Sequence, residues 1–134
     1  MHRDLIRYVL ARAGASTLTR ILKLLFLADY YAMYYLSKRI TKTEWVNHYY
    51  GAFSWDLVNE ITNDEEIDSR YDILNDRVYY VYNGETPTID YEVKEFLDYV
   101  IDKYKNYTDY ELVLESKKLA GVEPGDVIFR RVEE

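Results

Sequence analysis

The fold is decided by the stretch T-L-T-R-I-L-K-L-L-F-L-A-D-Y-Y-A-M-Y-Y-L, which runs from Thr17 to Leu36. Apolar residues recur along it at steps of three or four, the spacing that places side chains on one face of a helix. Others, such as Phe26, widen this face well beyond a narrow stripe. A helix that is apolar around most of its circumference has to be covered on several sides. We therefore predict a central helix over Leu18–Leu36, with Thr17 or Ser16 as its N-cap.

Asp29 is the exception on this apolar face. A buried carboxylate is costly unless hydrogen bonds or a cation satisfy it. We predict that Asp29 is buried and ionised, and that it accepts hydrogen bonds from the segment Tyr50–Ser54. The alternative is an acid poised for chemistry or for binding a ligand, although structural networks also bury carboxylates.

The segment that follows contains two helix-start signals. Thr41 stands three residues before Glu44, the spacing of a capping box, in which each side chain binds the other's backbone N–H. A short helix is therefore predicted there, with these side chains on one face: Trp45, Val46 and Tyr49. Tyr50-Gly51 ends it, because glycine tolerates the positive φ found at helix ends. Ser54 has the side chain of an N-cap for a further helix over Trp55–Ile61.

A change of period marks a predicted β-hairpin. Arg70–Leu74 and Arg77–Tyr82 are rich in tyrosine and β-branched residues, and they flank Asn75-Asp76. Asn and Asp tolerate the left-handed conformation of a two-residue turn, so we predict a hairpin closed by this pair. An acidic run over residues 63–68 is predicted to be a surface connection.

Helical patterns occupy both ends of the remaining chain. Asp4–Ala13 is predicted to be a short helix, and Asp90 to be the N-cap of another that reaches residue 104. Thr108 and Glu111 form a second capping box, followed by a helix to about residue 119. Val127–Val132 is a candidate terminal strand that could join the hairpin. The prediction is one mostly helical α+β domain over residues 1–134, with shorter helices around the long one.

Composition supports a single folded domain. The chain has 134 residues, of which 49% are hydrophobic, so it can build a core and is not a disordered segment. It contains 16 tyrosines, a residue that suits both core margins and interaction surfaces. It contains no cysteine, which excludes disulfides and thiolate chemistry. The polar opening M-H-R-D and the charges within the long helix predict a cytoplasmic protein without a membrane span.

Charge is divided unequally along the chain. The net charge is −7, but residues 1–49 have a balance of +5 and residues 50–134 a balance of −12. An acidic surface repels phosphate backbones, which disfavours general nucleic-acid binding. Arginines of the first segment could still form a basic face: Arg3, Arg7, Arg12 and Arg20. The simpler interpretation is that the two segments attract each other or that these arginines are solvated.

Residues for catalysis are scarce. The only histidines are His2 and His48, and a lone histidine without cysteine is poor support for a metal site. The chain has no phosphate-binding glycine loop, dinucleotide fingerprint or zinc-protease motif. Its carboxylates are spread over predicted helix exteriors, so no acid–base pair can be nominated. We predict no cofactor, no metal and no enzymatic activity.

Three short motifs together resemble the Panacea (DUF4065) family, which includes SocA-like and GepA-like proteins. They are K-L-L-F-L-A-D (Lys23–Asp29), I-T (Ile40-Thr41) and Y-G-A-F-S-W-D-L (Tyr50–Leu57). A weaker similarity extends over Glu111–Asp126. The residues that match the family pattern and are expected to be structural are Lys23, Asp29, Thr41, Tyr50, Gly51 and Ser54. Ala52 departs from the pattern, because the family often carries a rigid proline there.

Two classes of function follow. The resemblance implies a non-enzymatic protein-interaction module, of the kind that neutralises a toxin or delivers a client to a protease. We expect the partner to bind an exposed aromatic surface drawn from Tyr49, Phe53, Trp55, Tyr80 and Tyr82. The alternative is a winged-helix-like transcriptional regulator that binds nucleic acid, with Arg70 and Arg77 on its hairpin. The acidic balance is the main argument against that alternative.

Overall fold

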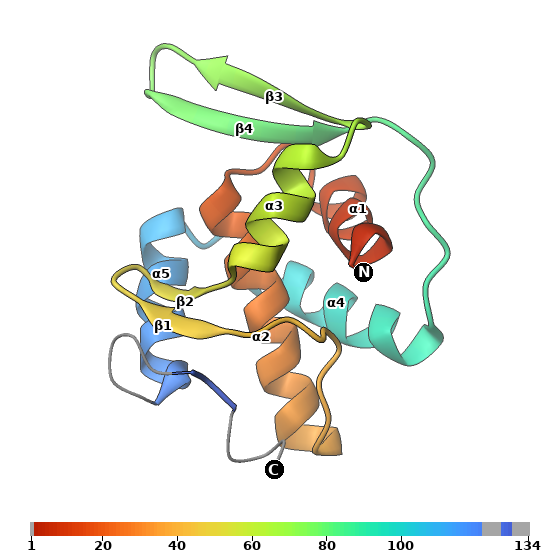
Figure 1. The fold of residues 1–134 in the computed structure, drawn as a ribbon, viewed down its shortest axis with the longest axis vertical. Coiled ribbons are helices and arrows are strands. Elements are labelled where there is room, and N and C mark those ends of the chain that lie inside the picture. The colour runs from red at the N-terminus through yellow and green to blue at the C-terminus, as the bar shows by residue number, and fades with distance from the viewer. Residues whose placement is uncertain (1, 122–126, 130–134) are drawn as a thin grey trace.

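The computed structural model describes residues 2–121 and 127–129. Helices and two small antiparallel sheets alternate along the chain (Figure 1). In chain order the elements are α1 (Arg3–Ala13), α2 (Leu18–Leu36), β1 (Val46–His48), β2 (Gly51–Phe53), α3 (Trp55–Asn63), β3 (Ile67–Asp72), β4 (Arg77–Tyr82), α4 (Tyr91–Tyr104) and α5 (Asp109–Ala120). The fold is α+β and mostly helical, as the sequence predicts.

Helix α2 has the predicted bounds and carries most of the core. Every residue from Ile21 to Asp29 is buried, so this part of the helix is covered on all sides. It contacts α1, α3, α4 and α5, and also β2 and β4; in Figure 1 it runs through the middle of the view. The Thr17 hydroxyl accepts the Arg20 N–H and starts the helix, and Ser37 ends it at a φ of 55°. Thr17 is therefore the N-cap, one of the two candidates.

The shorter helices begin at the capping residues that the sequence predicts. Asp90 accepts the N–H groups of Glu92 and Val93 at the start of α4. Thr108 and Glu111 form the complete capping box of α5. The predicted helix over Asp4–Ala13 is α1, which begins one residue earlier. Local side-chain chemistry thus places the starts of α4 and α5 correctly.

The predicted β-hairpin is present but its turn is longer. Asp72 pairs with Arg77, so residues 73–76 form the loop instead of Asn75-Asp76 alone. The Asp72 carboxylate holds this loop by accepting the N–H groups of Leu74 and Asn75 and the Asn75 side-chain amide. The first strand starts at Ile67, inside the acidic run that we expected to be a surface connection. The hairpin is attached to the body where Ser16 and Tyr80 exchange backbone hydrogen bonds.

The predicted short helix after Thr41 is wrong. Residues 46–48 and 51–53 form the β1–β2 hairpin, in which Val46 pairs with Phe53. The capping box does not form at Thr41, because its side chain donates to Asp29 instead. Trp45 also donates to Asp29 and its carbonyl accepts the Ile128 N–H, which keeps the chain extended. Tertiary hydrogen bonds therefore override the local helix signal.

The predicted terminal strand is only partly within the described residues. Val127 forms a single bridge with Val46, so it adds to β1. We expected it beside the other hairpin, β3–β4, and this part of the prediction is wrong. Residues 130–132 of that prediction lie outside the described residues.

Candidate interaction surface and the network beneath it

Asp29 is fully buried and both of its carboxylate oxygens accept hydrogen bonds. Oδ1 accepts from the Ile40 N–H (2.7 Å) and the Thr41 N–H (2.8 Å). Oδ2 accepts from the Thr41 hydroxyl and from Trp45 Nε1 (2.7 Å). Burial raises the pKa of Asp29, and the bonds from Thr41 and Trp45 oppose this shift. Burial of Asp29 is confirmed, but its partners lie in residues 40–45, so the predicted bonds from Tyr50–Ser54 are wrong.

Lys23 of α2 holds strand β2 in place. Its side chain is buried, and Nζ donates to the Ala52 carbonyl at 2.8 Å. Burial lowers the pKa of Lys23 to about 8, and the nearby Lys117 contributes to the same shift. A buried ammonium group has to be hydrogen-bonded, so the bond from Lys23 to the Ala52 carbonyl fixes the position of β2 relative to α2.

Hydroxyl groups complete the attachment of β2. The Ser116 Oγ of α5 accepts the Ala52 N–H at 2.7 Å. A Cβ added at Gly51 would lie 2.7 Å from the same Oγ, and Gly51 has a φ of 90°, so only glycine fits here. Ser54 caps α3 by accepting the Leu57 N–H and also exchanges a hydrogen bond with the Thr43 hydroxyl.

Three members of this network were missed by the sequence reasoning: Thr43, Trp45 as a donor, and Ser116. Ser116 lies on the buried face of α5, which is otherwise apolar. A small hydroxyl on the apolar face of an amphipathic helix is the signal that could have identified it, since a buried hydroxyl needs a partner. Trp45 carries a similar signal, because a buried indole usually donates its N–H.

An aromatic surface lies above this network, and we define it as His48, Tyr49, Tyr50, Phe53 and Trp55. Tyr49 is 72% exposed, Tyr50 59% and Trp55 65%. The rings contact one another in pairs. The distances between ring centroids are 5.0 Å for Tyr49 and Tyr50, 5.0 Å for His48 and Phe53, and 4.8 Å for Phe53 and Trp55. The Lys117 ammonium lies 5.2 Å from the Tyr49 ring. These large rings are thus exposed to solvent, and the hydrogen-bond network described above holds the backbone that carries them.

The predicted partner-binding residues fall into two groups. Tyr49, Phe53 and Trp55 belong to the aromatic surface. Tyr80 and Tyr82 are half-buried on β4, in the other sheet. The Tyr82 hydroxyl donates to the Glu85 carbonyl, and Arg7 lies over its ring. Both tyrosines pack against the core cluster, so they join the hairpin to the body.

The N-terminal arginines contact carboxylates of the acidic segment. Arg7 donates two hydrogen bonds to Asp64, and the bond lowers the pKa of that carboxyl. Further pairs of this kind are Arg12 with Asp98 and Arg20 with Asp109. The structure therefore supports the simpler interpretation, in which the two oppositely charged segments attract each other.

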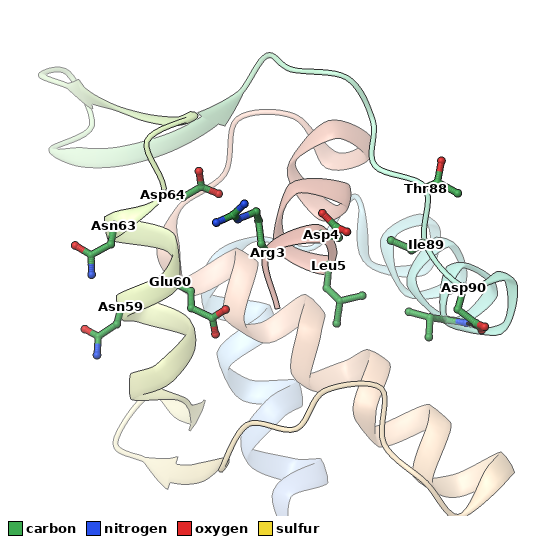
Figure 2. A pocket seen from close by; sticks show the side chains of 11 residues that line it. Arg3, Asp4, Leu5, Asn59, Glu60, Asn63, Asp64, Thr88, Ile89 and Asp90 are labelled. Carbon is green, nitrogen blue, oxygen red and sulfur yellow. Dashed lines mark hydrogen bonds between the residues drawn. The ribbon is translucent and has the colours of Figure 1, made fainter. Parts of the chain in front are cut away.

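An open groove of about 880 Å³ runs between α1, α3 and the segment before α4 (Figure 2). Its charged lining includes Glu60, Asp64 and Asp90, and Arg3 points toward Asp64. Each of these carboxylates already accepts hydrogen bonds from the chain: Glu60 from His2, Asp64 from Arg7, and Asp90 from the start of α4. The bonds of Glu60 and Asp64 therefore hold α1 and the residue before it against α3.

No group of potential metal ligands occurs among residues 2–121 and 127–129. Within the same residues, no helix is both long and apolar enough to cross a membrane. Both oxygens of Asp29, the buried acid, are bonded to Ile40, Thr41 and Trp45, and His48 packs its ring on Phe53. The alternative of Asp29 as an acid open to a ligand is thus not supported by its position.

The class of the protein follows from these features and from a family comparison. It is a mostly helical α+β domain that carries an aromatic surface on a short hairpin. The family model described as antitoxin SocA-like, Panacea domain, matches residues 21–119, from α2 to the end of α5. The chain belongs to this family, as the resemblance in Lys23–Asp29 and Tyr50–Leu57 predicts. No curated protein and no solved structure matches significantly.

Proposed function

We propose that the protein is a non-enzymatic interaction module of antitoxin type, which binds a partner protein through the aromatic surface. The observation that carries this proposal is the exposure of Tyr49, Tyr50 and Trp55 on one rigid hairpin and helix start. Tyrosine and tryptophan are the residues most often found at the energetic centre of protein interfaces. Membership of an antitoxin-like family supports a protein partner, such as a toxin.

The support beneath the surface is part of the argument. Lys23 and Ser116 hold both the carbonyl and the N–H of Ala52, and Ser54 fixes the start of α3. The rings are therefore presented without a large ordering cost on binding, and such pre-organisation raises affinity. Neutralisation of a toxin requires tight binding, which this arrangement favours.

Nucleic-acid binding is less well supported. Arg77, one of the two arginines expected on the hairpin, contacts Asp109, and the N-terminal arginines contact other carboxylates. A cation that is already paired with a carboxylate of the chain has to give up that pair before it can replace a counterion on a phosphate. Such a cation therefore adds little to nucleic-acid binding. Binding to random duplex DNA with a steep negative dependence on salt would contradict the protein-interaction proposal.

The test takes as candidate partner the product of any toxin-like reading frame that neighbours the gene, and co-expresses it with this chain. We expect Trp55→Ala and Tyr49→Ala to weaken complex formation in a pull-down and to reduce rescue of growth. Tyr91→Ala is the matched control, because Tyr91 is 74% exposed but lies on α4. Equal binding by all three variants would overturn the proposal. Circular dichroism of each variant separates loss of binding from loss of fold.

A further inference from the structure

Strand β3 has one unpaired edge. It pairs with β4 in a sheet that contains only these two strands among the described residues. In Figure 1, β3 is the outermost strand at the top, and β4 lies between it and the body. The only backbone bridge of this hairpin to another segment is made by β4, through Tyr80 and Ser16, within the part of the chain that the structure describes. The outer backbone groups of β3 are therefore available to a further strand.

Side chains on the inner face of the hairpin also remain open near its tip. Ile67, Ser69 and Tyr71 share this face, because they pair with Tyr82, Tyr80 and Val78. Ile67 is buried at the base, whereas Tyr71 is 60% and Val78 is 42% exposed. At the tip, Ile73 is 79% and Leu74 is 94% exposed. The hairpin thus extends apolar side chains beyond the part that packs on the body.

The outer face carries an alternating charge pattern. Asp68, Arg70 and Asp72 lie on this face, opposite Val81, Tyr79 and Arg77 of β4. Directly opposite side chains on neighbouring strands interact, and unlike charges are favoured while like charges are disfavoured. A strand added at this edge should therefore carry a basic, an acidic and a basic residue opposite these three. Apolar residues between them would face Ser69 and Tyr71.

We infer that β3 is a docking edge for an extended segment of a partner protein with the pattern basic–apolar–acidic–apolar–basic. The pattern reads the same in both directions, so it fits a parallel or an antiparallel strand. Backbone hydrogen bonds supply the binding and the charges select the sequence, as in other cases of strand addition. This inference goes beyond the proposed function, because β3 belongs to a different sheet from the aromatic surface.

A second copy of the chain fits this edge less well. Two β3 strands paired antiparallel about Arg70 would place Arg70 opposite Arg70 and Asp68 opposite Asp72. Both contacts bring like charges together, which is destabilising. Pairing about Tyr71 instead would place Arg70 opposite Asp72 twice but Asp68 opposite Leu74, so a second copy forms two of the three charge pairs. A segment with the complementary pattern forms all three, and charge complementarity therefore favours a different protein.

The test compares two labelled peptides that contain K-V-E-V-K or the charge-inverted E-V-K-V-E, each flanked by threonines. We expect the first to bind in fluorescence anisotropy and the second to bind about tenfold more weakly, because three charge pairs change sign. Amide hydrogen exchange should slow in β3 when the first peptide is present, since new backbone hydrogen bonds protect those amides.

Variants fix the site and separate this inference from the proposed function. The exchange variant Asp68→Lys with Arg70→Glu conserves net charge and should reverse the peptide preference. Trp55→Ala should leave peptide binding unchanged, although it weakens binding of the co-expressed toxin. Equal affinity for both peptides, protection outside β3, no binding at millimolar peptide, or self-association through β3 in sedimentation would each overturn the inference.

Discussion

At the scale of single residues, Asp29 shows how one carboxylate can join distant segments. Its oxygens accept hydrogen bonds from Ile40, Thr41 and Trp45 in a fully buried site. Asp29→Ala leaves these donors unpaired and should lower the free energy of unfolding by about 3–5 kcal/mol. Asp29→Asn keeps one accepting oxygen, but its NH₂ group would face the Trp45 N–H, and two donors cannot bond each other. We therefore expect the free energy of unfolding to fall by about 1–3 kcal/mol.

Urea denaturation of the wild type and of both variants measures these losses. Tyr34→Ala on the exposed part of α2 is a suitable control, because it removes no buried partner. A wild-type stability for Asp29→Ala would contradict the role given to the carboxylate.

Lys23 predicts an unusual dependence of stability on pH. Its folded-state pKa is about 8, below the usual value of 10.5 in the unfolded chain. Between these two values the unfolded state binds the additional proton, so stability rises with pH, by about 1 kcal/mol per pH unit. We expect the stability of the wild type relative to Lys23→Met to increase from pH 7 to pH 9. Denaturation at each pH checks this, and a difference that is constant with pH would contradict it.

The sequence predicts what is unusual about a residue better than it predicts its partner. Asp29 interrupts an apolar helix face, so its burial could be foreseen from spacing alone. Its donors could not, because Thr41 and Trp45 reach it only through the path of the loop after α2. Similarly, Lys23 could be assigned to a motif, but its bond to Ala52 depends on the packing of β2 against α2.

At the scale of elements, the segment 41–53 shows where local signals fail. The capping-box spacing of Thr41 and Glu44 favours a helix, yet the chain forms the β1–β2 hairpin. Helices α4 and α5 were predicted correctly, because their caps bind N–H groups of the same segment. Residues 41–45 instead bind Asp29, which is distant in sequence. Local chemistry decides an element only where no stronger tertiary partner competes.

The β1–β2 hairpin should tolerate no side chain at Gly51. Its φ of 90° disfavours other residues, and a Cβ would lie 2.7 Å from Ser116 Oγ. Gly51→Ala should therefore lower the free energy of unfolding by about 1–3 kcal/mol. Ser116→Ala removes the close Oγ but also the acceptor of the Ala52 N–H, so it is destabilising by itself. Gly51→Ala should therefore cost less in a Ser116→Ala background than in the wild type, while the backbone strain remains. Gly14→Ala tests strain alone, because a Cβ there meets nothing within 4 Å.

At the scale of the whole molecule, ion pairs join the basic N-terminal segment to the acidic remainder of the chain. Arg7, on α1, binds Asp64 beyond α3, and Arg20, on α2, binds Asp109 of α5. The basic and acidic segments that the sequence shows are thus partly neutralised by folding. The sequence reveals this imbalance, but it does not reveal which arginine meets which carboxylate, since that depends on the packing of α1 and α3.

The Arg7–Asp64 pair should be lost in acid. Both side chains are largely buried, and the pair lowers the pKa of Asp64. Its contribution is therefore present above the unfolded-state pKa of the carboxyl and disappears as pH falls through the folded-state value. Arg7→Met should cost about 2–4 kcal/mol at neutral pH. This deficit should stay constant from pH 7 to about pH 5 and shrink as the pH falls below about 4 in denaturation experiments. A deficit that does not change in acid would contradict the assignment.

The two tryptophans occupy opposite environments, and this gives the protein two intrinsic fluorescent reporters. Trp45 is fully buried and bonded to Asp29, whereas Trp55 is 65% exposed on the aromatic surface. Iodide in solution should quench Trp55 and leave Trp45 bright, so a partner that covers the surface should protect the quenchable fraction. Unfolding should instead shift the blue emission of Trp45 to the red. Binding and unfolding can then be followed separately in one cuvette, without any added label.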